Sequence, residues 1–384
     1  MKKSRPVKIK RYRRSFSGSG AKKNLARRIL LWVVILGAVF GVGWLVAKPG
    51  LDLASGLWYR YKNGGGAPSS QAVSSTPAAS SSQPQPASTE APQPTQAPAA
   101  NGMGGWAMVA LSEADTPEKA TALAAQLQAQ GVTYVVLPLK DDRGYLYYNS
   151  ALPLAQKSIA ATTVDAAAIA TAFRNAGVTP VAGLCAFKDS LVPFVDRTTA
   201  VKYNNQDITW LDTSKELGGK AWLNPNSPVA QQYITDLIGE VKGLGFDTVL
   251  LQNLQFPEGS GLNLASYGAM AGTKEQLLAQ LGQQYQSIDG VSVWFEFPAA
   301  AVRGEAAASY GASPATFGLQ RVFVRLDDAA LSDSTGLAGL LSPFVSGGAT
   351  GFGVRGVSGS TPEALAVVND AAKQAGFTSY FVIP

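Results

Sequence analysis

The sequence predicts an α/β protein, a (β/α)8 TIM barrel preceded by a single transmembrane helix and a disordered linker. Three observations predict this arrangement: an uncharged apolar stretch near the N-terminus, a Ser-, Pro- and Ala-rich segment after it, and a repeated helix-glycine-strand pattern in the remainder. They divide the chain into residues 1–28 (basic cytoplasmic tail), 29–47 (transmembrane signal anchor), 48–63 (juxtamembrane segment), 64–102 (linker) and 103–384 (barrel).

The first 28 residues carry a strong positive charge, with twelve Lys and Arg residues and no acidic residue. The rest of the chain holds 20 basic and 26 acidic residues, a net charge of −6. A basic tail on an acidic body argues against a nucleic-acid-binding domain and indicates a topology signal. Because positive segments stay on the cytoplasmic side, we expect a single-pass cell-membrane protein with an extracytoplasmic C-terminal domain.

The stretch from Ile29 to Ala47 is 19 residues long and has no charged residue. At 1.5 Å per residue, a helix of this length crosses most of a hydrocarbon core about 30 Å thick. It lacks a convincing small-x-small cleavage site, so an uncleaved signal anchor is favoured over a removed signal peptide. The linker that follows has almost no charge or large apolar residue, and its proline content gives it a reach of up to about 100 Å.

The barrel prediction depends on four glycines, Gly131, Gly177, Gly245 and Gly376, each of which follows a helical segment and precedes an apolar run. Each glycine is expected to end a helix, and each apolar run to enter a strand buried on both faces. The predicted strands are 106–111, 133–139, 180–186, 248–252, 291–297, 321–326, 351–355 and 379–383. A doubly wound open sheet is the alternative, but no G-x-G-x-x-G follows the first strand, so a dinucleotide site has no support.

The composition excludes several kinds of catalytic site. The chain contains no histidine, which removes serine-histidine-acid triads and every histidine-containing metal site. Its only cysteine, Cys185, lies in the apolar run P-V-A-G-L-C-A-F and is expected to be a buried core thiol, because no base is at hand to form the thiolate. Catalysis would therefore use carboxylates, lysine, tyrosine or arginine, and the sequence predicts no cofactor and no metal.

Polar residues gather where the predicted strands end, and a barrel builds its site at these carboxyl ends. In chain order they are Lys140, Asp141, Asp142, Arg143, Lys188, Asp189, Gln252, Asn253, Gln255, Glu296, Arg325, Asp327, Asp328 and Arg355, with Trp210, Trp222 and Asn224 in the long loop after the third strand. Aromatic rings beside acids and amides suit a carbohydrate, whose ring faces stack while its hydroxyls take hydrogen bonds.

Five motifs carry a resemblance to a known family: K-D-D-R-G-Y from Lys140, P-L-A from Pro153, F-K-D from Phe187, A-W-L-N-P from Ala221, and G-F-D running to F-P-E-G from Gly245. Over about residues 105–260 the chain resembles the family of putative glycoside hydrolases, bacterial barrels related to the α-amylase clan. The resemblance implies a carbohydrate as ligand, and a catalytic aspartate in the fourth strand.

The chain departs from that family's pattern at the barrel mouth. The family's fourth strand reads G-F-D-E-I-Q-F-D-Y-V-R-F-P, so its aspartate, tyrosine and arginine fall on Gln252, Asn253 and Gln255. Other acids of the pattern fall on Pro138 and Asn224, and the third-strand arginine falls on Gly183. A glycosidase needs two carboxylates, and a glutamine serves neither as acid nor as nucleophile.

Glu296 is the best remaining acid, because burial among Trp294, Phe295 and Phe297 would raise its pKa as a proton donor requires. Asp327 is its predicted partner. The predicted substrate-binding residues are Asp141, Asp142, Arg143, Lys188, Asp189, Trp222, Asn224, Gln252, Asn253, Trp294, Arg325 and Arg355. For the charges from Lys140 to Arg143, an ion-pair network that fixes the loop is the favoured interpretation over direct substrate contact.

Three functions follow from these observations. The first is a membrane-anchored extracytoplasmic barrel that binds cell-wall or capsular polysaccharide with degenerate catalysis. The second is an active glycosidase that uses Glu296 as its acid, with Asp327 or Asp142, so the sequence leaves enzymatic activity open. The third is a structural scaffold whose barrel docks a protein partner.

Overall fold

The computed structural model describes residues 105–356, 362–377 and 380–383. The predicted basic tail, transmembrane anchor, juxtamembrane segment and linker lie outside the described residues. Within the described ranges, no helix combines the length and the apolar character needed to cross a membrane.

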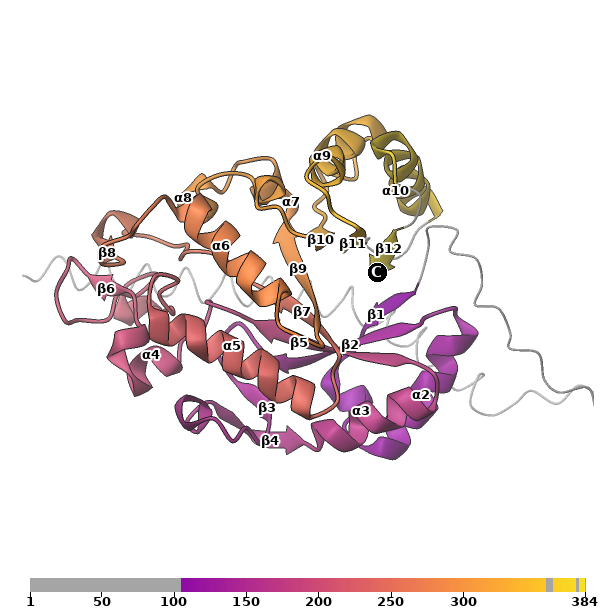
Figure 1. The fold of residues 1–384 in the computed structure, drawn as a ribbon, viewed down its shortest axis with the longest axis horizontal. Helices are drawn as coiled ribbons and strands as arrows, with labels where there is room; N and C mark the ends of the chain where they lie inside the picture. The colour runs from indigo at the N-terminus through magenta and orange to yellow at the C-terminus, as the bar shows by residue number, and fades with distance from the viewer. Residues whose placement is uncertain (1–104, 357–361, 378–379, 384) are drawn as a thin grey trace, which may run out of the picture. The chain divides into compact units, whose positions relative to one another are not determined.

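The centre of the fold is a mostly parallel sheet, which confirms the α/β prediction (Figure 1). Its parallel strands are β1 (Trp106–Met108), β2 (Tyr134–Lys140), β5 (Thr179–Cys185), β7 (Thr248–Gln252), β9 (Ser292–Pro298), β10 (Arg321–Arg325), β11 (Gly351–Arg355) and β12 (Phe381–Ile383). Each of the eight predicted strands overlaps one of these. The spatial order follows the chain order without the reversal that marks a doubly wound sheet, and Gly105, next to β1, pairs in parallel with Val382 of β12.

Helices alternate with these strands along the chain (Figure 1). They are α2 (Pro117–Ala129), α3 (Ala166–Asn175), α4 (Val192–Val195), α5 (Pro228–Gly243), α6 (Lys274–Gln286), α7 (Ala299–Val302), α8 (Ala307–Tyr310), α9 (Ser334–Ser346) and α10 (Pro362–Ala375). Short 3-10 turns are η1 (Leu111–Glu113), η2 (Pro153–Ala155), η3 (Arg197–Thr199), η4 (Lys215–Leu217), η5 (Leu262–Leu264) and η6 (Pro314–Thr316).

The helix ends form as the sequence predicts. Gly177 follows α3 with φ of 77° and Gly245 follows α5 with φ of 99°, a left-handed conformation that glycine adopts without a Cβ penalty. The next N–H then reaches back to the helix, as Val178 does to the carbonyl of Phe173 at 2.9 Å. At its other end, α2 begins after Thr116, whose hydroxyl accepts from the Lys119 N–H at 3.3 Å.

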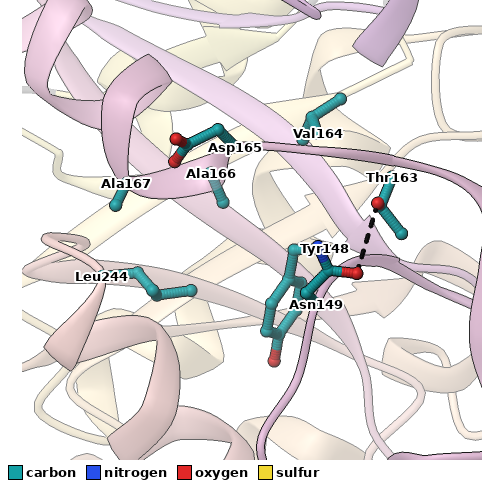
Figure 2. Close-up of a pocket in the computed structure, with 8 residues that line it drawn as sticks. All are labelled: Tyr148, Asn149, Thr163, Val164, Asp165, Ala166, Ala167 and Leu244. Atoms are coloured by element: carbon teal, nitrogen blue, oxygen red, sulfur yellow. Dashed lines mark hydrogen bonds between the residues drawn. The ribbon is translucent and has the colours of Figure 1, made fainter.

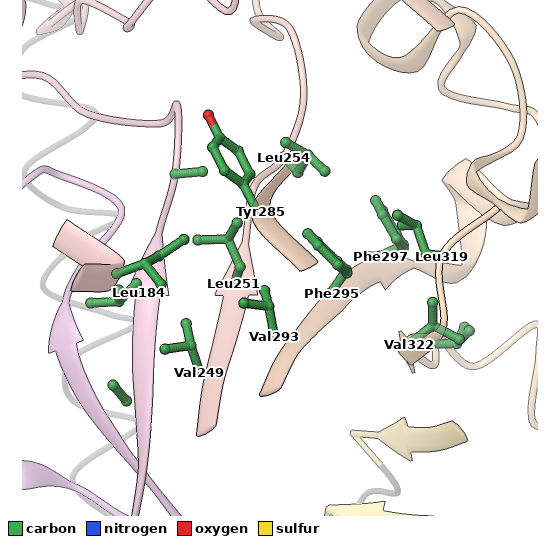
Figure 3. Close-up of a cluster of buried hydrophobic side chains, with 14 of the residues drawn as sticks. Leu184, Val249, Leu251, Leu254, Tyr285, Val293, Phe295, Phe297, Leu319 and Val322 are labelled. Carbon is green, nitrogen blue, oxygen red and sulfur yellow. The ribbon is translucent and has the colours of Figure 1, made fainter. Parts of the chain in front are cut away.

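Side chains alternate between the two faces of the parallel strands and form two separate cores. The larger core lies between strands and helices, where Leu184, Val249, Leu251, Val293 and Phe295 project from three neighbouring strands (Figure 3). The smaller core lies on the opposite face of the sheet and consists of Trp106, Val136, Val181, Leu250, Trp294, Phe323 and Ile383.

The smaller core is closely filled by aromatic rings. The Trp106 ring centroid lies 4.8 Å from that of Phe323 and 5.1 Å from that of Trp294. At Gly353 on β11, an added Cβ would lie 2.0 Å from Cε1 of Phe323, so the glycine makes the space that this ring occupies. This face of the sheet is therefore closely packed with side chains around Trp106, Trp294 and Phe323.

Four short strands were not predicted. β3 (Leu146–Tyr148) pairs antiparallel with β2, and β4 (Ile159–Val164) pairs with β3. β6 (Lys202–Tyr203) and β8 (Ala265–Ser266) form a separate two-stranded sheet. They lie in the segments that follow β2, β5 and β7. β3 and β4 pair within the single segment after β2, whereas β6 and β8 pair across two loops that are distant in the chain. The first predicted strand is also too long, because Leu111 already belongs to η1.

Candidate functional site

Four of the predicted site residues meet at the carboxyl ends of β7, β9, β10 and β11. Gln252 pairs in register with Glu296, and Arg325 pairs in register with Arg355. Residues at such register positions on parallel strands face the same side of the sheet. We call Gln252, Glu296, Arg325 and Arg355 the Glu296 cluster.

Glu296 is the buried centre of this cluster, with a side chain that is 3% exposed. Nη1 of Arg355 lies 2.7 Å from Oε1 and 2.6 Å from Oε2, and the amide Nε2 of Gln252 donates to Oε2 at 3.0 Å. Nη1 of Arg325 lies 3.7 Å from Oε1. Every one of these groups is a donor or a cation, so both carboxylate oxygens of Glu296 act as acceptors.

The apolar surroundings expected for Glu296 are therefore not what the structure shows. Phe295 and Phe297 point to the opposite face of β9, into the core beneath the helices, since neighbouring residues of a strand alternate. Trp294 shares the face of Glu296 but packs deeper, in the core around Trp106. The side chains that reach Glu296 come from other strands.

Asp327, the predicted partner of Glu296, is engaged by Arg303. Nη2 of Arg303 donates to Oδ2 at 2.7 Å and Nη1 to Oδ1 at 3.2 Å, while Oδ1 also accepts from the Ala330 N–H at 2.9 Å. The hydrogen bonds from Arg303 hold the pKa of Asp327 below its ordinary value. Asp327 thus lies in an ion pair and caps a turn.

The motifs K-D-D-R-G and F-K-D meet in a buried ion pair. Nζ of Lys140 lies 2.9 Å from Oδ2 of Asp189, and both side chains are completely buried. Lys140 also donates to the carbonyl of Cys185 at 2.8 Å. Oδ1 of Asp189 accepts from the N–H groups of Leu191 and Val192 at 2.9 and 3.0 Å, so this pair fixes the start of the loop after β5.

The glycine of the same motif explains how closely the two loops pack. A Cβ at Gly144 would lie 2.3 Å from Oδ1 of Asp189, and Gly144 has φ of 99°. Only a glycine meets both conditions without strain.

Asp141 is bonded within its own loop. It accepts from the N–H groups of Arg143 and Tyr145 at 3.0 and 2.9 Å, from Nε of Arg143 at 2.9 Å, and from the hydroxyl of Tyr147 at 3.0 Å. Its burial opposes ionisation, but the hydrogen bonds from Tyr145, Arg143 and Tyr147 outweigh this effect and lower the pKa of Asp141. These contacts agree with the ion-pair interpretation of the charged run.

Lys188 connects the second and fourth strand ends. Its Nζ lies 3.0 Å from Oε1 of Glu258 and 3.5 Å from Oδ2 of Asp142, and it stands 5.6 Å from the ring centre of Trp222. Burial acts to lower the pKa of Lys188, but the hydrogen bond and charge of Glu258 raise it overall. Glu258 was not predicted as a site residue, although it is the acid of the quoted F-P-E-G.

The predicted Trp222 and Asn224 lie in the packed interior of the long loop after β5. Trp222 is 1% exposed, and its Nε1 donates to Oδ2 of Asp212 at 3.3 Å. Asn224 is 7% exposed, and its Nδ2 donates to the carbonyl of Tyr267 at 3.2 Å. Asp212 was missed by the sequence analysis, because nothing in its local sequence indicates that it meets Trp222.

Asn253, which follows β7, has φ of 54°, a left-handed conformation that is uncommon outside glycine. Its Oδ1 accepts from Sγ of Cys185 at 2.9 Å. Cys185 is buried, as predicted, and burial raises the pKa of its thiol to about 12. Two residues on, Oε1 of the buried Gln255 accepts from the hydroxyl of Tyr310 at 2.5 Å.

The structure also brings together positions where the chain departs from the family pattern. Pro138 of β2 pairs in register with Gly183 of β5, which are the positions of the pattern's second-strand acid and third-strand arginine. An acid and an arginine at adjacent register positions would neutralise each other, and losing one alone would leave a buried charge. In this chain both positions hold uncharged residues.

A cavity of about 270 Å³ lies away from the strand ends, beside β3, β4 and α3 (Figure 2). Its lining includes Tyr148, Asn149 and Thr163, and the Thr163 hydroxyl donates to Oδ1 of Asn149 at 3.3 Å. The one acid in the lining, Asp165, caps α3 by accepting from the Ala168 N–H.

In the part of the chain that the structure describes, no group of three or more Cys, Asp or Glu side chains is placed to hold a metal ion.

Residues 108–295 match the model of a family described as "Putative glycosyl hydrolase domain". No curated protein shows significant sequence similarity to the chain.

Several solved structures resemble the chain at low identity. A hypothetical protein from Ruminiclostridium thermocellum is 18% identical, with 49% of this chain and 95% of that chain covered and a TM-score of 0.43. A glycoside hydrolase family 20 β-N-acetylglucosaminidase is 14% identical, with 74% and 64% covered and a TM-score of 0.45. The glycoside hydrolase domain of PelA from Pseudomonas aeruginosa is 15% identical, with 73% and 94% covered and a TM-score of 0.39. The chain thus spans less than two thirds of the family 20 enzyme.

Proposed function

We propose, from the match of residues 108–295 to the model of a putative glycosyl hydrolase domain, that the protein is a membrane-anchored, extracytoplasmic (β/α)8 barrel that binds cell-wall or capsular polysaccharide with degenerate catalysis. The barrel assignment is supported by eight parallel strands in chain order and by the bridge from Gly105 to Val382, which joins the two ends of that order.

One observation carries the proposal: Glu296, the predicted catalytic acid, is paired with arginine instead of with a second carboxylate. Glu296 is held by Arg355 and by Gln252, the residue at the position of the family's catalytic aspartate. Hydrolysis needs two carboxyl groups, about 5 Å apart for retention or about 6.5–9.5 Å apart for inversion. A glutamine that donates to the remaining glutamate leaves this cluster with one carboxyl group.

The other strand-end acids support the same conclusion. Asp189 is paired with Lys140, Asp141 with Arg143, and Asp327 with Arg303. A general acid has to give up a proton to the substrate, whereas each of these carboxylates is held in an ion pair with a cation of the protein.

The proposed location follows from the N-terminal sequence. The basic segment 1–28, the uncharged stretch 29–47 and the proline-rich segment 64–102 suit a cytoplasmic tail, a membrane anchor and a tether. A tethered domain outside the membrane would meet the polysaccharides of the wall or capsule.

The test is glycan binding by the full chain, measured by titration calorimetry against purified wall and capsular polysaccharides, together with reducing-end release. We expect saturable binding without release. Lack of affinity across a broad panel would contradict the proposal. Release that disappears in Glu296→Gln, but persists in the control Glu305→Gln, would instead establish the alternative of an active glycosidase.

A second candidate, a scaffold that docks a protein partner, is favoured by two exposed apolar side chains that line one cavity. Phe194, Ile208 and Leu217 are 63%, 54% and 77% exposed, and Phe194 and Ile208 line a cavity of about 430 Å³. Exposed apolar side chains that gather at one hollow mark a docking site more often than side chains exposed singly. If this cavity docks a protein, Phe194→Ser with Ile208→Ser should abolish a specific crosslink in cells while glycan binding by calorimetry stays unchanged.

A further inference from the structure

We propose that the Glu296 cluster binds an anionic group of the glycan, a carboxylate or a phosphate, through Arg325 and the free edge of Arg355. This inference rests on the proposed function and names the class of polysaccharide that the strand ends would select.

The first argument is the balance of charge. The Glu296 cluster holds two arginines and one carboxylate, an excess of one positive charge. The other ion-pair groups described at these strand ends have no such excess, since each holds one cation with one or two acids. They are Lys140 with Asp189, Arg143 with Asp141, Lys188 with Asp142 and Glu258, and Arg303 with Glu305 and Asp327.

The second argument is the placement of the two arginines. Arg325 and Arg355 are the last residues of adjacent parallel strands and are register partners, so their side chains stand next to each other on one face. Like charges directly opposite each other destabilise a sheet unless an anion lies near both. Glu296 supplies one such anion from the buried side of the two arginines. A ligand anion on the solvent side would neutralise the remaining positive charge.

The third argument is the number of free donors. Arg325 is 51% exposed at its side chain, and its contact with Glu296 at 3.7 Å is an ion pair that is too long for a hydrogen bond. Arg355 uses Nη1 alone for Glu296, which leaves Nε and Nη2 without a bonded partner among the described residues. A guanidinium with free N–H groups matches the paired oxygens of a carboxylate or phosphate.

The fourth argument is that Arg355 is held in place by a buried partner, unlike an isolated arginine on a protein surface. Glu296 is buried and bonded to Arg355, so it orients that guanidinium before any ligand arrives. Because Gln252 is already bonded to Glu296 through its amide nitrogen, its amide oxygen remains to accept a sugar hydroxyl next to the anion. Orientation in advance lowers the entropic cost of binding.

The experiment compares ligands that differ only in charge. Binding of the full chain is measured by calorimetry to polygalacturonate, to the same polymer with its carboxylates methyl-esterified, and to poly(glycerol phosphate). We expect polygalacturonate to bind about tenfold or more tightly than its neutral ester, with an affinity that falls as NaCl is added. Poly(glycerol phosphate) distinguishes a phosphate source from a uronate source.

The variant Arg325→Gln removes the excess charge at an exposed position and should fold normally. It is expected to weaken binding of the acidic polymer about tenfold and to reduce or abolish the preference for that polymer over its neutral ester. The matched control is Arg321→Gln, which removes the same charge at the opposite end of the same strand.

Equal affinity for the acidic polymer and its ester, or an unchanged affinity in Arg325→Gln, would overturn the anion site while the proposed glycan binding stands. Absence of binding to every glycan, acidic or neutral, would overturn both. Selective, salt-sensitive binding that Arg325→Gln weakens and Arg321→Gln does not would support both.

Discussion

The buried pair of Lys140 and Asp189 gives the sharpest prediction about stability. Both side chains are completely buried, and Nζ lies 2.9 Å from Oδ2. Lys140→Met would leave the Asp189 carboxylate without a cation inside the protein. Breaking a buried ion pair by removing one partner costs about 3–5 kcal/mol, and the lost hydrogen bond to the carbonyl of Cys185 adds about 1 kcal/mol.

The opposite change, at Asp189, should lower the free energy of unfolding by less than Lys140→Met does. In Asp189→Asn, the amide oxygen can keep the two N–H bonds from Leu191 and Val192, so the main loss is the charge that faces Lys140. We expect Asp189→Asn to lower the free energy of unfolding by about 3 kcal/mol. The double variant leaves no unpaired charge, so its cost should fall about 2 kcal/mol or more below the sum of the two single variants.

The assay is urea unfolding of the full chain followed by tryptophan fluorescence, with midpoints compared at equal slope. The control is Lys119→Met, because the ion pair of Lys119 with Asp115 is exposed and should contribute under about 1 kcal/mol. If Lys140→Met costs no more than Lys119→Met, or if the two single effects are additive, the buried pair does not hold the two loops together as described.

Three further outcomes are expected. Gly353→Ala should destabilise the fold by about 1–3 kcal/mol because its Cβ would meet the Phe323 ring, and Phe323→Leu should recover much of this loss in the same unfolding assay. Cys185, whose pKa is raised to about 12 by burial, should resist a thiol-specific disulfide reagent at pH 8 until urea unfolds the protein; rapid labelling of the folded chain would contradict this. Arg303→Gln should destabilise by under about 1 kcal/mol at pH 7. The lowered pKa of Asp327 means that this contribution is present above the ordinary carboxyl pKa and is lost as the pH falls through the lowered value, so unfolding midpoints should differ less at pH 3.

The main strands and the helix ends were largely predictable because they depend on residues that are close together in the sequence. The glycine after each helix and the cap at Thr116 act within a few residues, and apolar runs of five to seven residues are buried wherever the sheet forms. The short strands β3, β4, β6 and β8 were missed for the complementary reason. The pairing of β6 with β8 depends on where two distant loops meet in space, and β3 and β4 are short strands whose pairing shifts register within one loop.

The candidate site was predictable in position but not in pairing. The sequence located charged and amide residues at the strand ends, and it identified Gln252 at the position of the expected aspartate. It did not indicate that Asp327 would bind Arg303, or that Asp189 would bind Lys140. Each partner is chosen by loop paths and side-chain directions that no short pattern encodes.

The sequence by itself determined the eight parallel strands, the helix ends, the buried thiol at Cys185 and the amide at Gln252, where the resemblance implies an acid, because each depends on residue type and on spacing within one element. Only the tertiary structure decided which side chains surround Glu296. Its neighbours Arg325 and Arg355 come from strands that are 29 and 59 residues further along the chain, and only strand register places their guanidinium groups beside its carboxylate. A charge acts over a few ångströms, so its effect is set by its neighbours in space, which the sequence alone does not specify.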